Sequence, residues 1–159
     1  MKYLSKQEEK EKFHFFELAA EEARKSCCLR SKCAAVLVKD NEVIGVGHNS
    51  PPLDEKVEKC IKNELNPEFK SDKTCCIHAE DRALRAGLKT DPKKVMGSRL
   101  YFIRLGENNE MKRSGSPYCT MCSKMALNEG VGEWALWHDN GIGIYDAKEY
   151  NDVSFNYKQ

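Results

Sequence analysis

Two short clusters in the sequence carry residue types that bind transition metals. The first is the run 75–80, Cys-Cys-Ile-His-Ala-Glu, and the second is the run 117–122, Pro-Tyr-Cys-Thr-Met-Cys. Zinc accepts imidazole nitrogen and thiolate sulfur, and a Cys-x-x-Cys pair at the start of a helix lets two thiolates reach one tetrahedral ion. The predicted ligands are His78, Cys119 and Cys122. Three protein ligands leave one position for water, which distinguishes a catalytic zinc from a structural one.

Both clusters stand at the start of a predicted helix, where the backbone amides offer partial positive charge and lower thiolate pKa values. His78 and Glu80 are two residues apart, which on a regular helix turns their side chains to nearly opposite sides. We therefore expect His78 to lie just outside the helix. Glu80 can then reach a zinc-bound water without binding the metal and serve as general acid and base, and the small Ala79 leaves room for close approach.

Each motif by itself is a weak signal. A Cys-x-x-Cys pair is often a structural zinc corner or a redox pair, and a His-Ala-Glu triplet is common by chance. In this order and on these elements the two together are much stronger. The alternative from another class is a zinc-stabilised binding module without catalysis, in which further cysteines complete a four-ligand site.

Hydrophobic periodicity predicts the elements that must position these residues. An amphipathic helix over 11–29 precedes a β-hairpin formed by 33–38 and 43–48. The elements expected after it are a short helix around 55–65, a helix over 78–86 stopped by Gly87, a strand over 100–103, a helix over 119–128, a strand over 134–137 and a weakly helical tail at 145–150. Strands that alternate with helices imply parallel pairing in the second half, and hence an α/β protein with a mixed sheet covered by helices.

Length and composition bound the class of protein. The 159 residues predict one domain over residues 1–159, and 26 basic against 25 acidic residues give a net charge of +1, which makes nucleic acid an improbable main partner. No apolar stretch is long enough for a membrane span, and the mixed-charge N-terminus is unlike a signal region. We therefore expect a cytoplasmic protein whose eight cysteines are thiols, metal ligands or catalytic groups rather than disulfides.

The combination of His-x-Glu and Cys-x-x-Cys is the signature of zinc deaminases. The chain resembles the cytidine and deoxycytidylate deaminase family, closest in appearance to the deoxycytidylate enzymes, and the likeness extends to residues 33–40, 45–52 and Ala83-Leu84. The resemblance implies a three-layer fold with a mixed five-stranded sheet and helices on both faces, assembled as a homo-oligomer. It also implies hydrolytic release of ammonia from a free cytosine nucleotide or nucleoside, with conversion of dCMP to dUMP as the best guess.

Residues that contact the substrate are also suggested by this resemblance. Asn49 matches the family's asparagine after the second strand and is expected to contact the sugar or the base. Ala79, Pro117 and Tyr118 are the other expected contacts. The family places proline directly before the first cysteine, whereas Tyr118 intervenes here, where it can form a wall for a planar base.

The sequence also bears on the class of substrate. The long segment 50–76 and the near-neutral charge favour a free nucleotide over tRNA, although this segment could equally cover a core edge or make a subunit contact. Lys73, Lys112 and Arg113 are candidates for a phosphate contact, or are simply solvated. A tRNA adenosine deaminase and a guanine deaminase are the alternatives within the enzyme class.

The remaining cysteines raise the question of a second metal. By resemblance to deoxycytidylate deaminases that carry a second, structural zinc in this region, Cys60, Cys75 and Cys76 are candidate ligands, with buried thiols as the alternative. We expect plain core packing for Cys27, Cys28 and Cys33.

Overall fold

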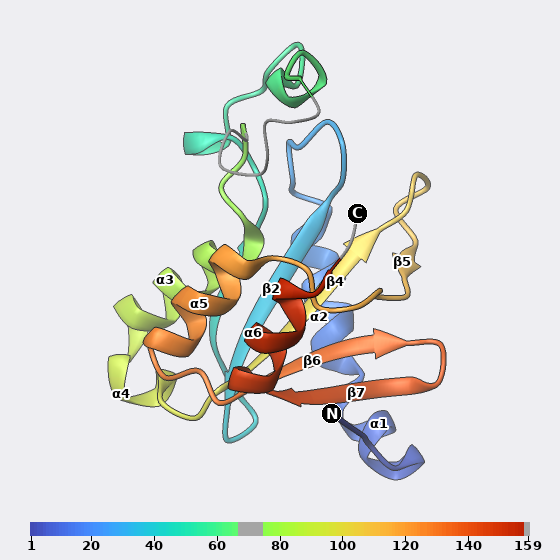
Figure 1. The fold of residues 1–159 in the computed structure, drawn as a ribbon, viewed down its shortest axis with the longest axis vertical. Helices are drawn as coiled ribbons and strands as arrows, with labels where there is room; N and C mark the ends of the chain where they lie inside the picture. The colour runs from blue at the N-terminus through green and yellow to red at the C-terminus, as the bar shows by residue number, and fades with distance from the viewer. Residues whose placement is uncertain (67–74, 158–159) are drawn as a thin grey trace.

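The computed structural model describes residues 1–66 and 75–157, and places helices on both faces of one mixed sheet (Figure 1). Within these residues the sheet has seven strands in the order β1-β7-β6-β4-β2-β3, with β5 paired to β4. The strands are β1 (Lys2–Tyr3), β2 (Cys33–Lys39), β3 (Glu42–His48), β4 (Arg99–Leu105), β5 (Met111–Lys112), β6 (Glu133–His138) and β7 (Gly141–Asp146). The helices are α1 (Lys6–Lys12), α2 (His14–Ala23), α3 (Ala79–Thr90), α4 (Pro92–Val95), α5 (Thr120–Asn128) and α6 (Ala147–Phe155), with 3-10 turns at Pro52–Asp54 and Ile61–Asn63.

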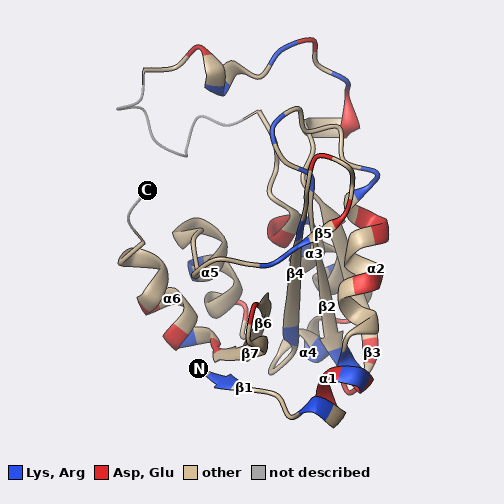
Figure 2. Ribbon diagram, turned by 90° about the vertical axis from the view of Figure 1, so that its right-hand side faces the viewer, with Lys and Arg blue, Asp and Glu red and all other residues tan. Residues whose placement is uncertain are grey.

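The expected three layers are present. Figure 2 shows α2 on one side of the sheet and α5 and α6 on the other. Strand β2 is buried on both faces because its side chains alternate between two hydrophobic clusters. On the side of α3, α5 and α6 lie Cys33, Ala35 and Leu37, and on the side of α2 lie Ala34, Val36 and Val38.

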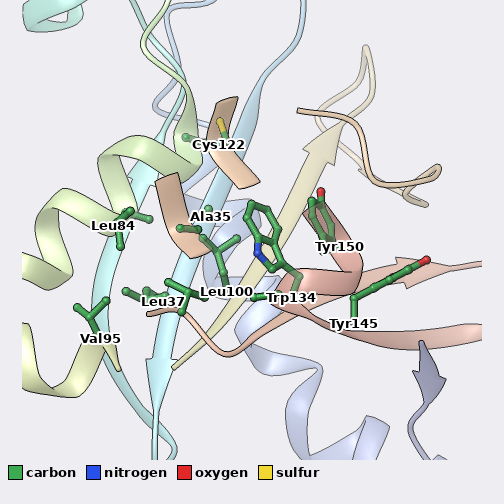
Figure 3. Close-up of a cluster of buried hydrophobic side chains, with 14 of the residues drawn as sticks. Ala35, Leu37, Leu84, Val95, Leu100, Cys122, Trp134, Tyr145 and Tyr150 are labelled. Carbon is green, nitrogen blue, oxygen red and sulfur yellow. The ribbon is translucent and has the colours of Figure 1, made fainter. Parts of the chain in front are cut away.

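Two aromatic rings attach the last helix to the sheet. Trp134 of β6 and Tyr150 of α6 stack with centroids 4.0 Å apart and planes 16° from parallel. Both are almost fully buried, in the same cluster as Leu100 and Leu37 (Figure 3). Stacked aromatic pairs contribute about 0.5–1.5 kcal/mol beyond their buried area, so this contact holds α6 firmly beside the strand.

Helix α3 lies against β3 at backbone distance because the strand carries glycine where the two meet. A Cβ at Gly47 would stand 2.5 Å from the Ala83 backbone nitrogen and 2.7 Å from the Ala79 carbonyl oxygen. At Gly45 it would stand 2.2 Å from the Ala83 carbonyl oxygen. No real Cβ contact is this short, so glycine is required on this face of the hairpin.

The first helix is shorter than its apolar pattern predicts. Its expected stripe is buried as far as Ala23, where α2 ends, so the prediction of a helix through residue 29 is wrong and Cys27 lies beyond it. The hydroxyl of Ser26 explains the ending, because it accepts a hydrogen bond from the Cys28 backbone nitrogen at 3.1 Å and bonds to the Asn49 side chain at 2.9 Å. A side chain that bonds to nearby backbone in this way competes with helix continuation.

The hairpin and the strands around residues 100–103 and 134–137 are confirmed, whereas three other predictions need correction. The expected helix around 55–65 is wrong, since its described residues hold only short 3-10 turns at its edge and within it. Gly87 does not stop α3; it lies inside the helix, where a Cβ would meet the Leu37 side chain at 2.7 Å.

The tail is the third correction. Its helix is confirmed from Ala147, where α6 begins, but residues 145 and 146 belong to strand β7. Strands β1 and β5 also join, so the sheet exceeds the expected five strands. The predicted parallel pairing holds for β4 and β6, but β6 and β7 form an antiparallel hairpin. No helix among the described residues is long and apolar enough to cross a membrane.

The contact between α3 and β3 leads to a stability prediction. We expect Gly47→Ala to lower the free energy of unfolding by about 1–3 kcal/mol, the usual range for overpacking, because rigid backbone cannot yield to the new methyl group. Gly115→Ala is the matched control, since no heavy atom lies within 4 Å of the position that its methyl group would take. Urea denaturation of both variants measures the difference, and equal midpoints would contradict this account of the packing.

Candidate active site

The predicted metal ligands and Glu80 lie at one edge of the sheet. Phe102 of β4 and Leu136 of β6, two neighbouring parallel strands, line the same cavity as the first residues of α3 and the residue before α5. In open α/β sheets, ligands bind beyond the carboxyl ends of parallel strands, and helix N-termini favour anions there. The edge that collects these residues is therefore the one where a binding site is expected.

Three ligand atoms converge at this edge. His78 Nδ1 lies 3.3 Å from Cys119 Sγ and 3.2 Å from Cys122 Sγ, and the two sulfurs are 3.2 Å apart. A tetrahedral zinc with ordinary bond lengths separates such ligand atoms by about 3.5–3.8 Å, so small side-chain movements are enough to receive the ion. Within the described residues, no fourth His, Cys, Asp or Glu has a ligand atom within 4.8 Å of all three.

Backbone conformation places each ligand at a helix entrance. His78 is the N-cap of α3, with the extended angles φ −71° and ψ 150°, so the prediction that it lies outside the helix is confirmed. The residue before it is fixed by a β-bridge, in which Ile77 donates a backbone hydrogen bond to Ser50 at 2.9 Å. Cys119 is the N-cap of α5, and its sulfur accepts the Cys122 backbone N–H at 3.4 Å.

The electrostatics of the three ligands favour a bound cation. A hydrogen bond with Cys122 lowers the pKa of the Cys119 thiol to about 4, so this residue readily becomes a thiolate. The contact with Cys119 raises the pKa of His78 to about 9, and the pKa of Cys122 is raised by its hydrogen bond with Cys119. Metal ligands must be deprotonated, so binding of a cation releases the protons that His78 and Cys122 hold.

Glu80 lies beside the metal ligands without being one of them. Its carboxyl group is hydrogen-bonded to the Cys122 thiol, and the residue is only 8% exposed. Burial raises the pKa of Glu80 to about 6. A buried carboxyl group next to a metal site can both accept and return a proton.

The cavity in front of these residues has a volume of about 590 Å³. This lies within the range of roughly 300–1,000 Å³ that is typical of small-molecule sites. Three of the four expected substrate contacts, Asn49, Ala79 and Tyr118, are among its lining residues. Pro117 is buried and is not part of the described lining, because Tyr118 occupies the position next to Cys119.

Asn49 also organises the wall on which it lies. Its Oδ1 accepts the Cys33 backbone N–H at 2.8 Å and bonds to the Ser26 hydroxyl at 2.9 Å, while its Nδ2 donates to the Ser31 carbonyl at 2.7 Å. These bonds join the end of β3 to the chain that enters β2. The amide therefore shapes the cavity through its own hydrogen bonds.

Basic side chains dominate the charge of the cavity lining. Arg30, Lys62, Arg104 and Arg113 line it, and Glu80 is the only acidic residue in the described lining. Arg113 was a sequence candidate for a phosphate contact, whereas Lys112 is not part of the described lining and Lys73 lies outside the described residues. The sequence patterns missed the other three cations because they come from separate segments without a shared motif.

Four further cysteines line the same cavity and form two pairs. The sulfurs of Cys60 and Cys75 are 3.8 Å apart, and Cys76 is hydrogen-bonded to Cys28. All four residues line the cavity. Plain core packing is therefore wrong for Cys28 and also for Cys27, which is half-buried and belongs to neither hydrophobic cluster. Both lie beyond α2 because the helix ends early. Cys33 is buried in the core as expected and borders the cavity as well.

Comparison with known proteins agrees with this donor set. Residues 8–137 match the family model described as the cytidine and deoxycytidylate deaminase zinc-binding region. A deoxycytidylate deaminase of Mycobacterium phage D29 is 33% identical over 126 residues, which cover 74% of this chain and 87% of the phage protein. The resemblance inferred from the two motifs thus extends over most of the chain.

Solved structures share the fold at lower identity. The dCMP deaminase of cyanophage S-TIM5 in its apo form superposes with a TM-score of 0.53 at 21% identity, over 82% of each chain, and the same enzyme has been solved with dCMP and dUMP. A cytidine deaminase from Burkholderia pseudomallei superposes with a TM-score of 0.58 at 17% identity, over 87% of this chain and 94% of that one.

Proposed function

Because the chain belongs to the cytidine and deoxycytidylate deaminase family and is a zinc-dependent deaminase of that type, we propose that its substrate is a free cytosine nucleotide, with dCMP converted to dUMP. The reaction consumes one water and releases one ammonia. The proposal includes assembly into a homo-oligomer, which the family resemblance predicts.

The observation that carries the choice of a nucleotide is the charge of the cavity. Its described lining has four basic residues, and its one carboxylate, Glu80, lies beside the metal ligands. A monoanionic or dianionic phosphate is stabilised by such surroundings, whereas a neutral nucleoside or guanine gains little from them. The volume of about 590 Å³ can hold a mononucleotide.

The proposed chemistry is shared between the metal and one carboxylate. Zinc held by His78, Cys119 and Cys122 would lower the pKa of a water molecule toward neutrality. Glu80 would accept one proton from the attacking water and give it to the ring nitrogen as the water oxygen bonds to the amino-bearing carbon. It would then take the second proton from the new hydroxyl group and pass it to the amino group, so that the C–N bond breaks and ammonia leaves. Burial keeps bulk water from competing for this proton.

The proposed substrate contacts use the remaining lining residues. Asn49 donates one Nδ2 hydrogen to Ser31 and has a second hydrogen for a sugar hydroxyl. Tyr118 meets Tyr157 edge to face, with centroids 4.9 Å apart, and the pair forms an aromatic wall for the base. Ala79 leaves space between the base and α3, and Pro117 acts through the backbone of the loop before Cys119.

The role of Glu80 is tested by removing its charge. We expect Glu80→Gln to retain zinc and to lose at least about 10²-fold in kcat, the low end for general acid and base groups. Glu17→Gln, on the exposed face of α2, is the control and should retain normal turnover. Metal analysis with steady-state kinetics gives both quantities. Near-normal turnover in Glu80→Gln would remove it from the mechanism.

The substrate is tested by a screen for ammonia release. We expect the highest kcat/KM with dCMP, lower values with deoxycytidine and cytidine, and none with guanine or an adenosine-containing tRNA stem-loop. Activity confined to tRNA or to guanine would reject the nucleotide proposal in favour of those deaminases. A metal-loaded protein inactive on every compound would favour a non-catalytic zinc-binding module.

We also propose that the thiols of Cys60, Cys75 and Cys76, joined by Cys28, hold a second, structural zinc. Four thiolates make a closed tetrahedral site without an open position. The four sulfurs form two pairs, Cys60 with Cys75 and Cys76 with Cys28, and the pairs must move together to share one ion, since no three of these sulfurs lie within 4.8 Å of one another. Such an ion would connect the segment after α2 to Cys60 and to the end of the segment 50–76.

Counting zinc separates the two sites. We expect two zinc ions per chain in the purified protein, one in Cys60→Ser, one in Cys122→Ser, and two in the control Cys27→Ser, whose thiol does not line the described cavity. Mass spectrometry of the intact protein and elemental analysis measure these numbers. A single ion in the unmodified protein, lost on Cys122→Ser, would reject the structural site and retain the catalytic one.

A further inference from the structure

Four cavity cations have no carboxylate partner in the described part of the chain. None of the ion pairs there involves Arg30, Lys62, Arg104 or Arg113. Elsewhere arginines are paired, as Arg99 is with Glu133. Like charges that gather in one cavity without counterions repel one another and favour an anionic ligand.

Arg113 is the most firmly positioned of the four. Its guanidinium carbon lies 3.5 Å from the centre of the Trp137 ring, and its Nη1 donates to the His138 carbonyl oxygen at 3.1 Å. Both partners belong to β6. A guanidinium fixed by stacking and by one hydrogen bond loses little side-chain entropy when its other N–H groups bind a ligand.

The residue after Arg113 supplies an unused hydrogen-bonding group. Ser114 Oγ is buried and has no hydrogen-bond partner among the described residues, although Ser114 lines the cavity. Its backbone is held on both sides, since its N–H donates to the Trp137 carbonyl at 2.7 Å and its carbonyl bonds to His138 Nδ1 at 3.0 Å. A buried hydroxyl without a protein partner is rare, and Ser114 Oγ can therefore donate a hydrogen bond to a molecule in the cavity.

Arg104 adds a second guanidinium on the neighbouring strand. It lies near the end of β4, where its backbone pairs with Lys112 of β5, directly before Arg113. Its side chain is hydrogen-bonded to the Cys33 thiol, another lining residue. The basic stretch that follows β5 runs past the end of β4 toward α5 (Figure 2). Two guanidiniums and one hydroxyl therefore border the same side of the cavity.

We infer that Arg113, Arg104 and Ser114 form a subsite for the 5′-phosphate of the nucleotide, with Arg113 as the residue that selects nucleotide over nucleoside. This inference rests on the proposed function and assigns residues to its phosphate. Two guanidiniums provide planar forks that match phosphate oxygens, and Ser114 donates a further hydrogen bond. Arg30 and Lys62 then attract the anion without fixing its position, since neither is held by a stacking partner among the described residues.

The test compares paired substrates in matched variants. For Arg113→Gln we expect kcat/KM for dCMP to fall about 10- to 100-fold, mainly through KM, while kcat/KM for deoxycytidine stays within about twofold. Lys112→Gln, one residue earlier and absent from the described lining, should change neither value. Arg113→Lys retains the charge without the planar fork and should recover part of the loss for dCMP.

A binding measurement is independent of the chemical step. We expect calorimetry to show that 2-deoxyribose 5-phosphate and dUMP bind the unmodified holoenzyme more tightly than deoxyuridine does, and that Arg113→Gln removes this difference. Binding of 2-deoxyribose 5-phosphate that depends on Arg113 supports the subsite even if the enzyme deaminates some other base, so failure of the proposed function is distinguishable.

Three outcomes would overturn the inference. The first is an equal loss for dCMP and deoxycytidine in Arg113→Gln, which indicates a structural role. The second is no loss for either substrate. The third is a selective loss for dCMP in Arg30→Gln or Lys62→Gln but not in Arg113→Gln, which assigns the phosphate to Arg30 or Lys62. A thermal melt of each variant confirms that the comparison is made on folded protein.

Discussion

The chemistry of this protein depends on bringing the N-termini of two helices to one point. His78 precedes α3 and Cys119 precedes α5, so an ion can be shared only if both helices begin at the same edge of the sheet. Helix α3 reaches that position by lying on the glycines of β3, and α5 follows the turn after β5. The partial positive charge of both N-termini stabilises the thiolates collected there.

The sheet gives the site its two contrasting surroundings. On the side of the helices, Glu80 is buried, and this burial raises its pKa. A raised pKa suits the proposed role of a group that accepts and returns a proton. On the open side, Arg104 near the end of β4 and Arg113 directly after β5 line the cavity. The cavity thus combines a buried carboxyl group with basic lining residues. The short strand β5 runs antiparallel to β4 and leads directly into Arg113.

The elements that were predicted form because of their local sequence, whereas those that were missed depend on contacts with distant segments. The hairpin around β2 and β3 was predicted because its two apolar runs are separated by turn-forming residues, and Asp40 and Asn41 do adopt positive φ. Strand β7 was not predicted. Gly141–Asp146 forms a strand because it pairs with β6 and β1, and the residues of this segment do not by themselves indicate that pairing. Gly87 by itself predicts a helix stop, whereas its small size serves a contact with Leu37 on the distant strand β2.

The two short motifs were enough to predict His78, Cys119 and Cys122 as metal donors with Glu80 beside them, because the spacing of such motifs reflects the coordination of one ion. The sequence by itself also determined the layered α/β class, through the alternation of apolar strands and amphipathic helices. Only the tertiary structure decided which basic residues face the cavity and that Cys28 joins the other thiols. The physical reason is that charged and thiol side chains on loops have no periodicity of their own, so their grouping follows from the packing of distant segments.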